Sequence, residues 1–325
     1  MSESNERIWQ KRFERERLIR KEAEALMEQK TLELYEINQK LQTTAEELRQ
    51  NNEELAAMVE FMNQQRKTIN QKSEDIAKSI EAAFRIQNAI SPSENELLHL
   101  FKAHFLLNIP RDTVSGDFLW VQEQNGLKIV VVADCTGHGV PGALMSVVGN
   151  ALLNKVVTDK QVQEPADILY WMNVYLKTFF QKSEVTIYEG MDAAVCVYVP
   201  NSRVLKYAGA HMSLYYTQNG DFFEIKATKN SLGGGGKNQD TEYNYSQHEL
   251  KLEKDSFFYL CSDGFQDQFG GPNDKRFLKK NLRNLLHTIH NQTAEYKKTS
   301  LSQAFHDWKG DNPQIDDLLL LGFEF

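Results

Sequence analysis

The chain has 325 residues, with 37 lysines and arginines against 45 aspartates and glutamates, and a net charge of −8 at pH 7. This acidic balance argues against nucleic acid as a default partner, because binding to nucleic acid needs a basic face that neutralises phosphates. No stretch approaches 18 consecutive apolar residues, and the polar N-terminus lacks a signal-peptide core, so we expect no membrane span. The three cysteines form no C-x-x-C pair. We therefore expect a cytoplasmic protein.

The first predicted element is one long helix over residues 1–91. This segment contains neither Gly nor Pro and is rich in good helix formers, and Ser91-Pro92-Ser93 then ends the helix. An apolar residue recurs every seven positions, which marks one column of a heptad seam: Leu34, Leu41, Leu48, Leu55, Met62, Ile69 and Ile76. The column three residues later is mixed, with polar residues such as Asn51 and Gln65. Polar core positions weaken a coiled coil while fixing its register or permitting two registers.

Two interpretations of this coiled coil stay open. It is either a plain dimerisation stalk or a signalling helix that reports an upstream event to the domain after it. Apolar residues become denser just before the helix ends, which suits a helix that docks on a globular domain: Ile76, Ile80, Ala83, Phe84 and Ile86. We expect a homodimer through residues 1–91, with an upstream sensor or receiver domain as a further candidate partner.

Residues 92–325 are predicted to form one globular domain, since their number falls within the single-domain range. Two helices are predicted in this part, at 143–157 and at 166–180. Short strands are predicted to follow, at 193–199, 204–208, 213–216 and 222–225. Helices before and between strand meanders suit two sheets that pack face to face with helices outside. The predicted fold class is therefore α+β.

Four aspartates are the candidate functional residues of this domain. Each stands where an apolar run that reads as a strand begins or ends: Asp117, Asp134, Asp263 and Asp316. Asp134, for example, directly follows the β-branched run 128–133. Antiparallel neighbours bring strand starts and strand ends to one edge of a sheet, so the four carboxylates are expected to converge. A single Asp beside a Gly is usually a turn residue, and the prediction therefore depends on the four together.

A convergent set of carboxylates indicates a metal-dependent hydrolase. The acids repel one another unless cations neutralise them, and hard divalent cations prefer oxygen ligands. Two Mg²⁺ or Mn²⁺ ions that keep several waters suit such a cluster, whereas soft metals would require Cys and His clusters that the sequence lacks. Two ions about 4 Å apart can activate a bridging water and hold phosphoryl oxygens during in-line attack. Such a mechanism needs no nucleophile from the protein.

Four motifs of the domain resemble the successive signature blocks of a known family. They are Ser115-Gly116-Asp117-Phe118, the segment 134–143 with its Gly137-His138-Gly139, Ser262-Asp263-Gly264-Phe265 and Asp316-Asp317. In this order they resemble SpoIIE-type serine/threonine phosphatases, the bacterial branch of the PPM (metal-dependent protein phosphatase) superfamily. The resemblance runs from about residue 86 to residue 325 and includes the lead-in Ile86-Gln87-x-Ala89-Ile90. It implies an α-β-β-α sandwich after the coiled-coil helix.

The resemblance also implies a role for each matched residue. Asp134 would bridge both metal ions, and the backbone carbonyl of Cys135 would be a neighbouring ligand. The remaining acidic ligands would be Asp117, Asp263 and Asp316. Asp117 and Asp134 would thereby place the metal-activated water, and Asp317 would support the ligands without binding metal.

Two further residues are candidates for the chemistry. His138 could act as general acid for the leaving serine oxygen. The histidine of the wider superfamily lies closer to the bridging aspartate, however, and a loop histidine held by Gly137 and Gly139 is the alternative. Arg111 could hold the substrate phosphate through its guanidinium, and a solvated loop arginine is the alternative there. The Cys135 thiol is either redox-sensitive beside a metal or only a small residue at that position.

The resemblance implies a phosphoserine/phosphothreonine protein phosphatase in bacterial signalling, regulated through the dimeric coiled coil. Its expected substrate is a small phosphorylated anti-sigma-factor antagonist of the STAS-domain type. Two alternatives stay open. One is a non-enzymatic scaffold that uses a phosphatase fold to bind a signalling partner, although the presence of all four acids argues against it. The other is a metal-dependent phosphohydrolase of small molecules.

Overall fold

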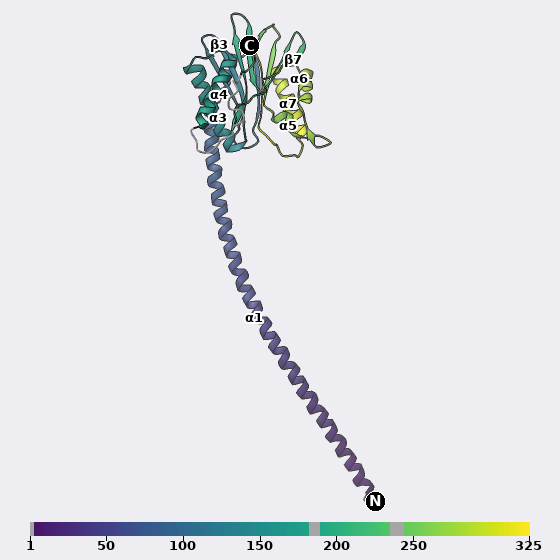
Figure 1. Cartoon of the computed structure of the whole chain (residues 1–325). Helices are drawn as coiled ribbons and strands as arrows, with labels where there is room; N and C mark the ends of the chain where they lie inside the picture. The colour runs from purple at the N-terminus through teal and green to yellow at the C-terminus, as the bar shows by residue number, and fades with distance from the viewer. Residues whose placement is uncertain (1–2, 182–188, 235–243) are drawn as a thin grey trace. The chain divides into compact units, whose positions relative to one another are not determined.

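The computed structural model describes residues 3–181, 189–234 and 244–325 (Figure 1). The chain divides into two compact units, Met1–Ile76 and Ala77–Phe325. The helix α1 (Glu3–Ile90) is 88 residues long, so its last part belongs to the second, globular unit. The predicted long helix before the globular domain is therefore present.

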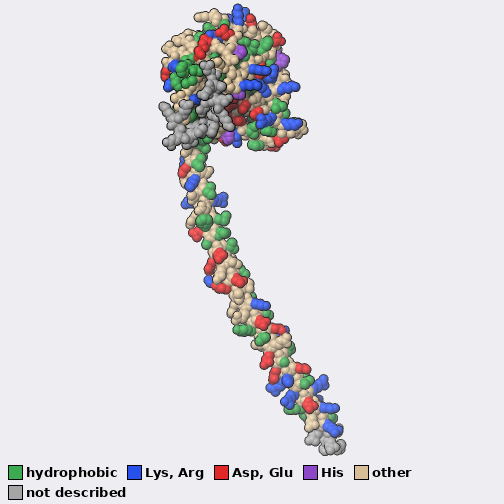
Figure 2. Space-filling view, viewed as in Figure 1, with side chains coloured by type: hydrophobic (Ala, Val, Ile, Leu, Met, Phe, Trp, Pro, Cys, Tyr) green, Lys and Arg blue, Asp and Glu red, His purple; other side chains and the backbone are tan. Residues whose placement is uncertain are grey.

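The first unit is a charged helix with an exposed apolar column. Each residue of the predicted heptad column is between 57% and 65% exposed in the single chain. Charged and apolar side chains alternate along its surface (Figure 2), and Arg49 pairs with both Glu46 and Glu53. Exposed pairs of this kind contribute only a few tenths of a kcal/mol each. Most helical stability comes from packing of an apolar face, so this column is the part of α1 that a partner helix would cover.

The second unit contains two large antiparallel sheets, beside one small two-stranded sheet. The first sheet has the order β1 (Ala103–Ile109), β13 (Leu318–Glu324), β10 (Phe257–Cys261), β6 (Leu214–Gln218) and β7 (Asp221–Ile225). The second has the order β2 (Phe118–Gln124), β3 (Leu127–Cys135), β4 (Gly190–Val199), β5 (Val204–Ala210) and β9 (Gln247–Lys251), and β8 (Leu232–Gly233) pairs with β4.

Helices cover the outer face of each sheet (Figure 1). On the side of the second sheet lie α3 (Gly139–Leu153), its π-helical continuation η1 (Asn154–Asp159) and α4 (Pro165–Gln181). On the side of the first sheet lie α5 (Gly264–Asp267), α6 (Lys279–Thr288) and α7 (Ala294–Lys309). Smaller elements are α2 (Glu94–Leu100), β11 (Phe269–Gly270) and β12 (Lys275–Arg276). This arrangement confirms the predicted α+β class and the α-β-β-α sandwich.

The apolar runs of the central strands follow from burial on both faces. In β3, Ile129 and Val131 pack under the helices α3 and α4, whereas Val130 and Val132 face the other sheet. Successive side chains of a strand point to opposite faces, so a strand between two apolar layers needs a continuous apolar run. The alternation repeats in β13, where Leu319 and Leu321 face the other sheet.

One helical stretch, Gly139–Asp159, is long and apolar enough to cross a membrane by length and composition alone. Half of its most apolar window is buried within the protein. The stretch packs against β2, β3 and α4, and Met145, Leu153 and Val156 belong to the core under it. These contacts are those of a core helix, which passes the same test of length and composition.

Candidate metal centre

The four candidate aspartates lie at one end of the sandwich, as their strand positions predict. Asp134 is the last residue but one of β3, and Asp263 follows β10 after Ser262. The backbone N–H of Asp263 lies 3.5 Å from Asp134 Oδ2, which joins the two sheets at this edge. Asp316 precedes β13, the neighbour of β10, and Asp117 precedes β2, the neighbour of β3. The structure therefore brings together residues that are far apart in the sequence.

Asp117 is the most deeply placed of these acids, with 4% of its surface exposed. Burial raises the pKa of Asp117 to about 8, and the nearby carboxylates of Asp317 and Asp316 act in the same direction. Hydrogen bonding from Ser262 and contact with Asp134 partly offset this rise. Among the described residues, Asp117 Oδ2 has no hydrogen-bond partner. A buried carboxylate oxygen without a donor is where a cation would be expected.

The other three acids are perturbed in the same sense. Burial raises the pKa of Asp134 well above its ordinary value, and Asp117, Asp263 and Asp316 raise it further. Burial, followed by the charge of Asp316, raises the pKa of Asp263 to about 6. Burial also raises the pKa of Asp316, although a backbone hydrogen bond from Asp317 opposes it. The acids therefore destabilise one another's charged forms, and divalent cations would relieve this repulsion.

These residues fit hard divalent cations. Within the described part of the chain, no three His, Cys, Asp or Glu side chains form a closed set of metal ligands. Mg²⁺ does not require one, because it keeps several waters and is often held by one or two carboxylates. The mutual repulsion of four carboxylates and the orphaned oxygen of Asp117 favour oxygen-preferring cations over the soft metals that thiolates bind.

Asp317 holds the backbone around these acids. It is 2% exposed, and its carboxylate accepts hydrogen bonds from the backbone N–H groups of Arg111 (2.8 Å) and Gly116 (2.7 Å). A Cβ on Gly116 would lie 2.7 Å from the carbonyl oxygen of Gly137, so only glycine permits this approach. Asp317 thus joins the start of β13 to the loop that carries Asp117.

Gln87, near the end of α1, is bonded to the same loop. Its side chain donates to the carbonyl oxygen of Ser115 (2.6 Å) and to Ser146 Oγ (2.9 Å), and it accepts from the backbone N–H of Ser115 (3.1 Å). It is 9% exposed. In the sequence Gln87 stands out only as part of the lead-in Ile86-Gln87-x-Ala89-Ile90, since a polar residue in a polar helix carries no sign that it will be buried.

His138 and Arg111 lie near the cluster without pointing to a single role. His138 Nδ1 lies 3.0 Å from Asp112 Oδ2, and the histidine charge would stabilise the Asp316 carboxylate. The Arg111 guanidinium donates to the carbonyl oxygen of Ile315 (2.8 Å) and also favours the charged form of Asp316. Both side chains are partly solvent-accessible, so a substrate could reach them.

The Cys135 thiol does not have the properties of a redox sensor. Cys135 is buried, and burial together with the neighbouring Asp134 and Asp117 raises its pKa well above the ordinary value. Reactive cysteines are instead exposed and electropositive, with a lowered pKa. Only the backbone carbonyl of Cys135 remains a candidate for the chemistry.

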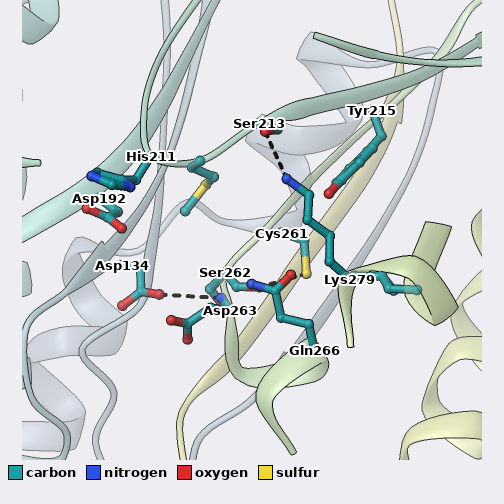
Figure 3. A pocket seen from close by; sticks show the side chains of 12 residues that line it. Asp134, Asp192, His211, Ser213, Tyr215, Cys261, Ser262, Asp263, Gln266 and Lys279 are labelled. Atoms are coloured by element: carbon teal, nitrogen blue, oxygen red, sulfur yellow. Dashed lines mark hydrogen bonds between the residues drawn. The ribbon is translucent and has the colours of Figure 1, made fainter. Parts of the chain in front are cut away.

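A pocket of about 220 Å³ opens beside Asp134 and Asp263 (Figure 3). Its lining includes Asp192, His211 and Lys279, which the sequence did not single out as functional residues. Asp192 lies opposite Asp134 in the β3–β4 register, and Ser231 Oγ donates to it (2.6 Å). His211 adopts a left-handed conformation with φ 58°, a strain that is often found at functional sites. The Lys279 amine lies 2.8 Å from Glu224 and 3.2 Å from Ser213 Oγ.

Comparisons with solved structures support this fold. The SiaA-PP2C domain of Pseudomonas aeruginosa is 31% identical, with a TM-score of 0.70 over 78% of this chain and 98% of that domain. The PP2C phosphatase domain with a regulatory fragment of SpoIIE from Bacillus subtilis is 14% identical, with a TM-score of 0.55 over 69% of this chain and 63% of that one. The RsbU and RsbW domains of a Mycobacterium tuberculosis protein are 13% identical, with a TM-score of 0.53 over 69% of this chain and 60% of that one.

Comparisons of sequence identify the family. A comparison with curated protein sequences found no match. The family model described as Stage II sporulation protein E (SpoIIE) matches residues 124–325, which is more than half of the chain and includes Asp134, Asp263 and Asp316. The domain of Pseudomonas aeruginosa adds a relative above 30% identity that is covered almost completely. The chain therefore belongs to the SpoIIE family of PP2C-type serine/threonine phosphatases.

Proposed function

We propose that the chain is a two-metal phosphoserine/phosphothreonine protein phosphatase of bacterial signalling, acting in the cytoplasm. The proposed ligands of the two Mg²⁺ or Mn²⁺ ions are Asp117, Asp134, Asp263, Asp316 and the backbone carbonyl of Cys135. The observation that carries this proposal is the convergence of four carboxylates from separate strand ends, each with a raised pKa, around an oxygen of Asp117 that lacks a donor. Such a cluster is costly for the protein unless it binds cations.

When bound, two such ions activate a water and neutralise the phosphoryl oxygens. The residues of the chain have complementary tasks. Asp317 fixes the backbone of Arg111 and Gly116, and so sets the position of Asp117. The Arg111 guanidinium, whose charge acts on Asp316, would bind a phosphate oxygen. His138 is oriented by Asp112 through Nδ1, which leaves Nε2 to protonate the leaving serine oxygen.

A protein substrate suits the site better than a small molecule. The pocket beside Asp134 and Asp263 has a volume of about 220 Å³ and is lined mostly by polar and charged side chains, whereas sites that enclose small ligands are predominantly apolar. A phosphorylated loop needs only its phosphoserine to enter. The substrate proposed from the family resemblance is a STAS-domain anti-sigma-factor antagonist.

The proposed assembly is a homodimer through α1. The exposed apolar column of α1 would be covered by the same column of a second copy, with the polar positions setting the register. The hydrogen bonds of Gln87 to the loop before Asp117 provide a route by which changes in this helix pair would reach the metal ligands. An upstream sensor or receiver domain would act on the same helix.

The test compares phosphate release from a phosphoserine STAS-domain protein and from nucleoside monophosphates, with Mn²⁺ and with chelator. We expect Mn²⁺-dependent release from the phosphoprotein with kcat/KM at least about a hundredfold above that for the nucleotides. A preference for the nucleotides would favour the small-molecule phosphohydrolase. Binding of the phosphoprotein without any turnover would favour the scaffold.

A further inference from the structure

A second pocket lies at the end of the first sheet that is remote from the metal centre. Its volume is about 290 Å³, and its walls come from the start of β1, the start of β10, the end of β13 and the N-terminus of α7. The strand β13 begins beside the metal centre at Leu318 and ends at Glu324 in this pocket, a span of roughly 20 Å. The pocket is therefore separate from the phosphatase site.

A buried lysine lies in the wall of this pocket. Lys297 is 3% exposed, and its amine lies 3.5 Å from the ring centroid of Phe257 and 5.7 Å from that of Tyr259. Among the described residues, no hydrogen bond or ion pair to this amine is formed. An ammonium group has three donors, and the Lys297 amine is not one of the described side-chain atoms that are fully buried without a partner, so water in the pocket can reach it. Aromatic rings stabilise the charge but accept no conventional hydrogen bond, so the amine can donate to an oxygen of a ligand in the pocket.

The N-terminus of α7 adds further donors at the same pocket. Thr293 caps this helix of 16 residues, accepting from the backbone N–H of Tyr296 (3.3 Å), and both Thr293 and Ala294 line the pocket. The N–H groups of the first turn lack acceptors within the helix, and the helix dipole favours negative charge there. Lys297 is in the second turn, and helical side chains lean toward the N-terminus. The amine and the first-turn N–H groups are therefore hydrogen-bond donors at the same pocket.

Two acidic residues also line the pocket, and neither is bonded to the Lys297 amine. Glu324 forms an ion pair with Lys102, and Asp255 is exposed. Burial lowers the pKa of Lys297 to about 8, and the charge of Glu324 only partly offsets this. Among the described residues, no carboxylate forms an ion pair with the Lys297 amine, so its charge is available to an anionic ligand.

We propose that this Lys297 pocket (Ala103, Phe257, Thr293, Ala294, Lys297 and Glu324) binds a small organic molecule through an oxyanion, either a carboxylate or a phosphate monoester. The oxyanion accepts from the Lys297 amine and from the first-turn N–H groups of α7. Phe257 and Ala103 contact the apolar body of the ligand. A volume of about 290 Å³ is larger than a bare oxyanion requires, which favours an organic ligand over an inorganic ion.

The test uses the full chain with a chelator present, so that the metal centre cannot retain the probes. Acetate, benzoate, inorganic phosphate and phenyl phosphate are titrated by calorimetry into the wild-type protein, Lys297→Met and the matched control Lys298→Met, whose side chain is exposed on the same helix. We expect saturable binding of benzoate or phenyl phosphate by wild type and Lys298→Met, at least about tenfold weaker in Lys297→Met. Binding of benzoate alone assigns a carboxylate ligand, and binding of phenyl phosphate alone assigns a phosphate monoester.

A second measurement covers failure of Lys297→Met to fold. In the wild-type protein, acetylation of Lys297 by a water-soluble amine reagent is compared with that of Lys298 by mass spectrometry. The bound probe should slow the acetylation of Lys297 at least about fivefold and leave Lys298 unchanged. Absence of saturable binding by the wild type, equal binding by Lys297→Met, or unchanged acetylation in the presence of saturating probe would each overturn the proposal.

Discussion

Asp117 shows at the level of one residue what the proposed metal centre demands of the protein. Its backbone N–H is satisfied by Ser115 Oγ (3.0 Å), whereas its buried Oδ2 has no donor in the described residues. An unsatisfied buried polar group costs about 1–3 kcal/mol, and more when it is charged. The position is therefore arranged for a ligand at the expense of stability, and the stability should depend on what occupies it.

The metal-free protein should lose stability as pH rises. Asp117 and Asp263 have folded-state pKa values of about 8 and about 6, above their ordinary 3.8. Between pH 4 and pH 8 the folded protein then binds more protons than the unfolded chain, so the free energy of unfolding falls with rising pH. With a chelator, the melting temperature should fall by at least about 4 °C from pH 5 to pH 8. A fall of this size corresponds to a loss of roughly 1–2 kcal/mol in the free energy of unfolding. Saturating Mg²⁺ should remove most of this slope, and an equal slope with Mg²⁺ would contradict the assignment.

The acids could be identified from the sequence because each interrupts or borders an apolar run, whereas their companions could not. Asp192 is inside β4, and only the pairing of Asp134 with Asp192 brings it to the site. Lys279 lines the pocket as the first residue of α6, directly after Leu278, which adopts a left-handed conformation with φ 72°. Long-range register and backbone strain of this kind leave no local pattern in the sequence.

At the scale of elements, the helices and strands were predicted closely where apolar periodicity defined them. The helix expected at 166–180 is α4 (Pro165–Gln181), and the strand expected at 193–199 is β4 (Gly190–Val199). The helix expected at 143–157 begins four residues earlier, at Gly139, and continues as the π-helical η1. Helix ends depend on capping and tertiary contacts more than on periodicity, so the boundaries were the least predictable part.

Gln87 is the contact that joins the helix α1 to the loop carrying Asp117. Replacing it with Ala leaves the backbone N–H and carbonyl of Ser115 without their partner, so we expect a loss of about 1–3 kcal/mol in stability. The apparent affinity for Mn²⁺ should fall as well, since the loop would lose its fixed position. The matched control is Asn88→Ala, because the Asn88 side chain is exposed. Equal melting temperatures and equal Mn²⁺ affinities for the two variants would show that Gln87 has no such role.

At the scale of the whole molecule, the sequence predicted a long helix, a phosphatase domain and a homodimer through residues 1–91, and the homodimer stays a prediction. The apolar column of α1 is exposed in the single chain, and five of the seven residues of its companion column (Ile37, Thr44, Asn51, Met58, Gln65, Lys72 and Ser79) are polar or charged. A seam of this composition is compatible with more than one register, which a single sequence does not resolve. The proposal that α1 transmits a signal therefore needs a test that changes phase without changing composition.

Insertions near Met58 provide that test. Four inserted residues shift the heptad phase by about half a repeat, whereas seven inserted residues restore it. We expect the insertion of four to change the oligomeric state, measured by light scattering, and to change phosphatase activity at least about threefold. The insertion of seven should leave both close to the wild type. A signalling role for the coiled coil would have to be abandoned if both insertions behaved like the wild type.

The proposed metal centre is tested most directly by Mn²⁺-dependent phosphate release from a phosphoserine STAS-domain protein. The wild type, Asp134→Ala and the control Asp311→Ala, whose side chain is exposed, are compared at equal folded concentration. Asp134 is the proposed bridging ligand, so its loss should lower turnover at least about a hundredfold, a cost similar to that of removing a key electrostatic stabiliser. Asp311→Ala should keep wild-type turnover. Wild-type turnover in a folded Asp134→Ala variant would contradict the proposed metal centre.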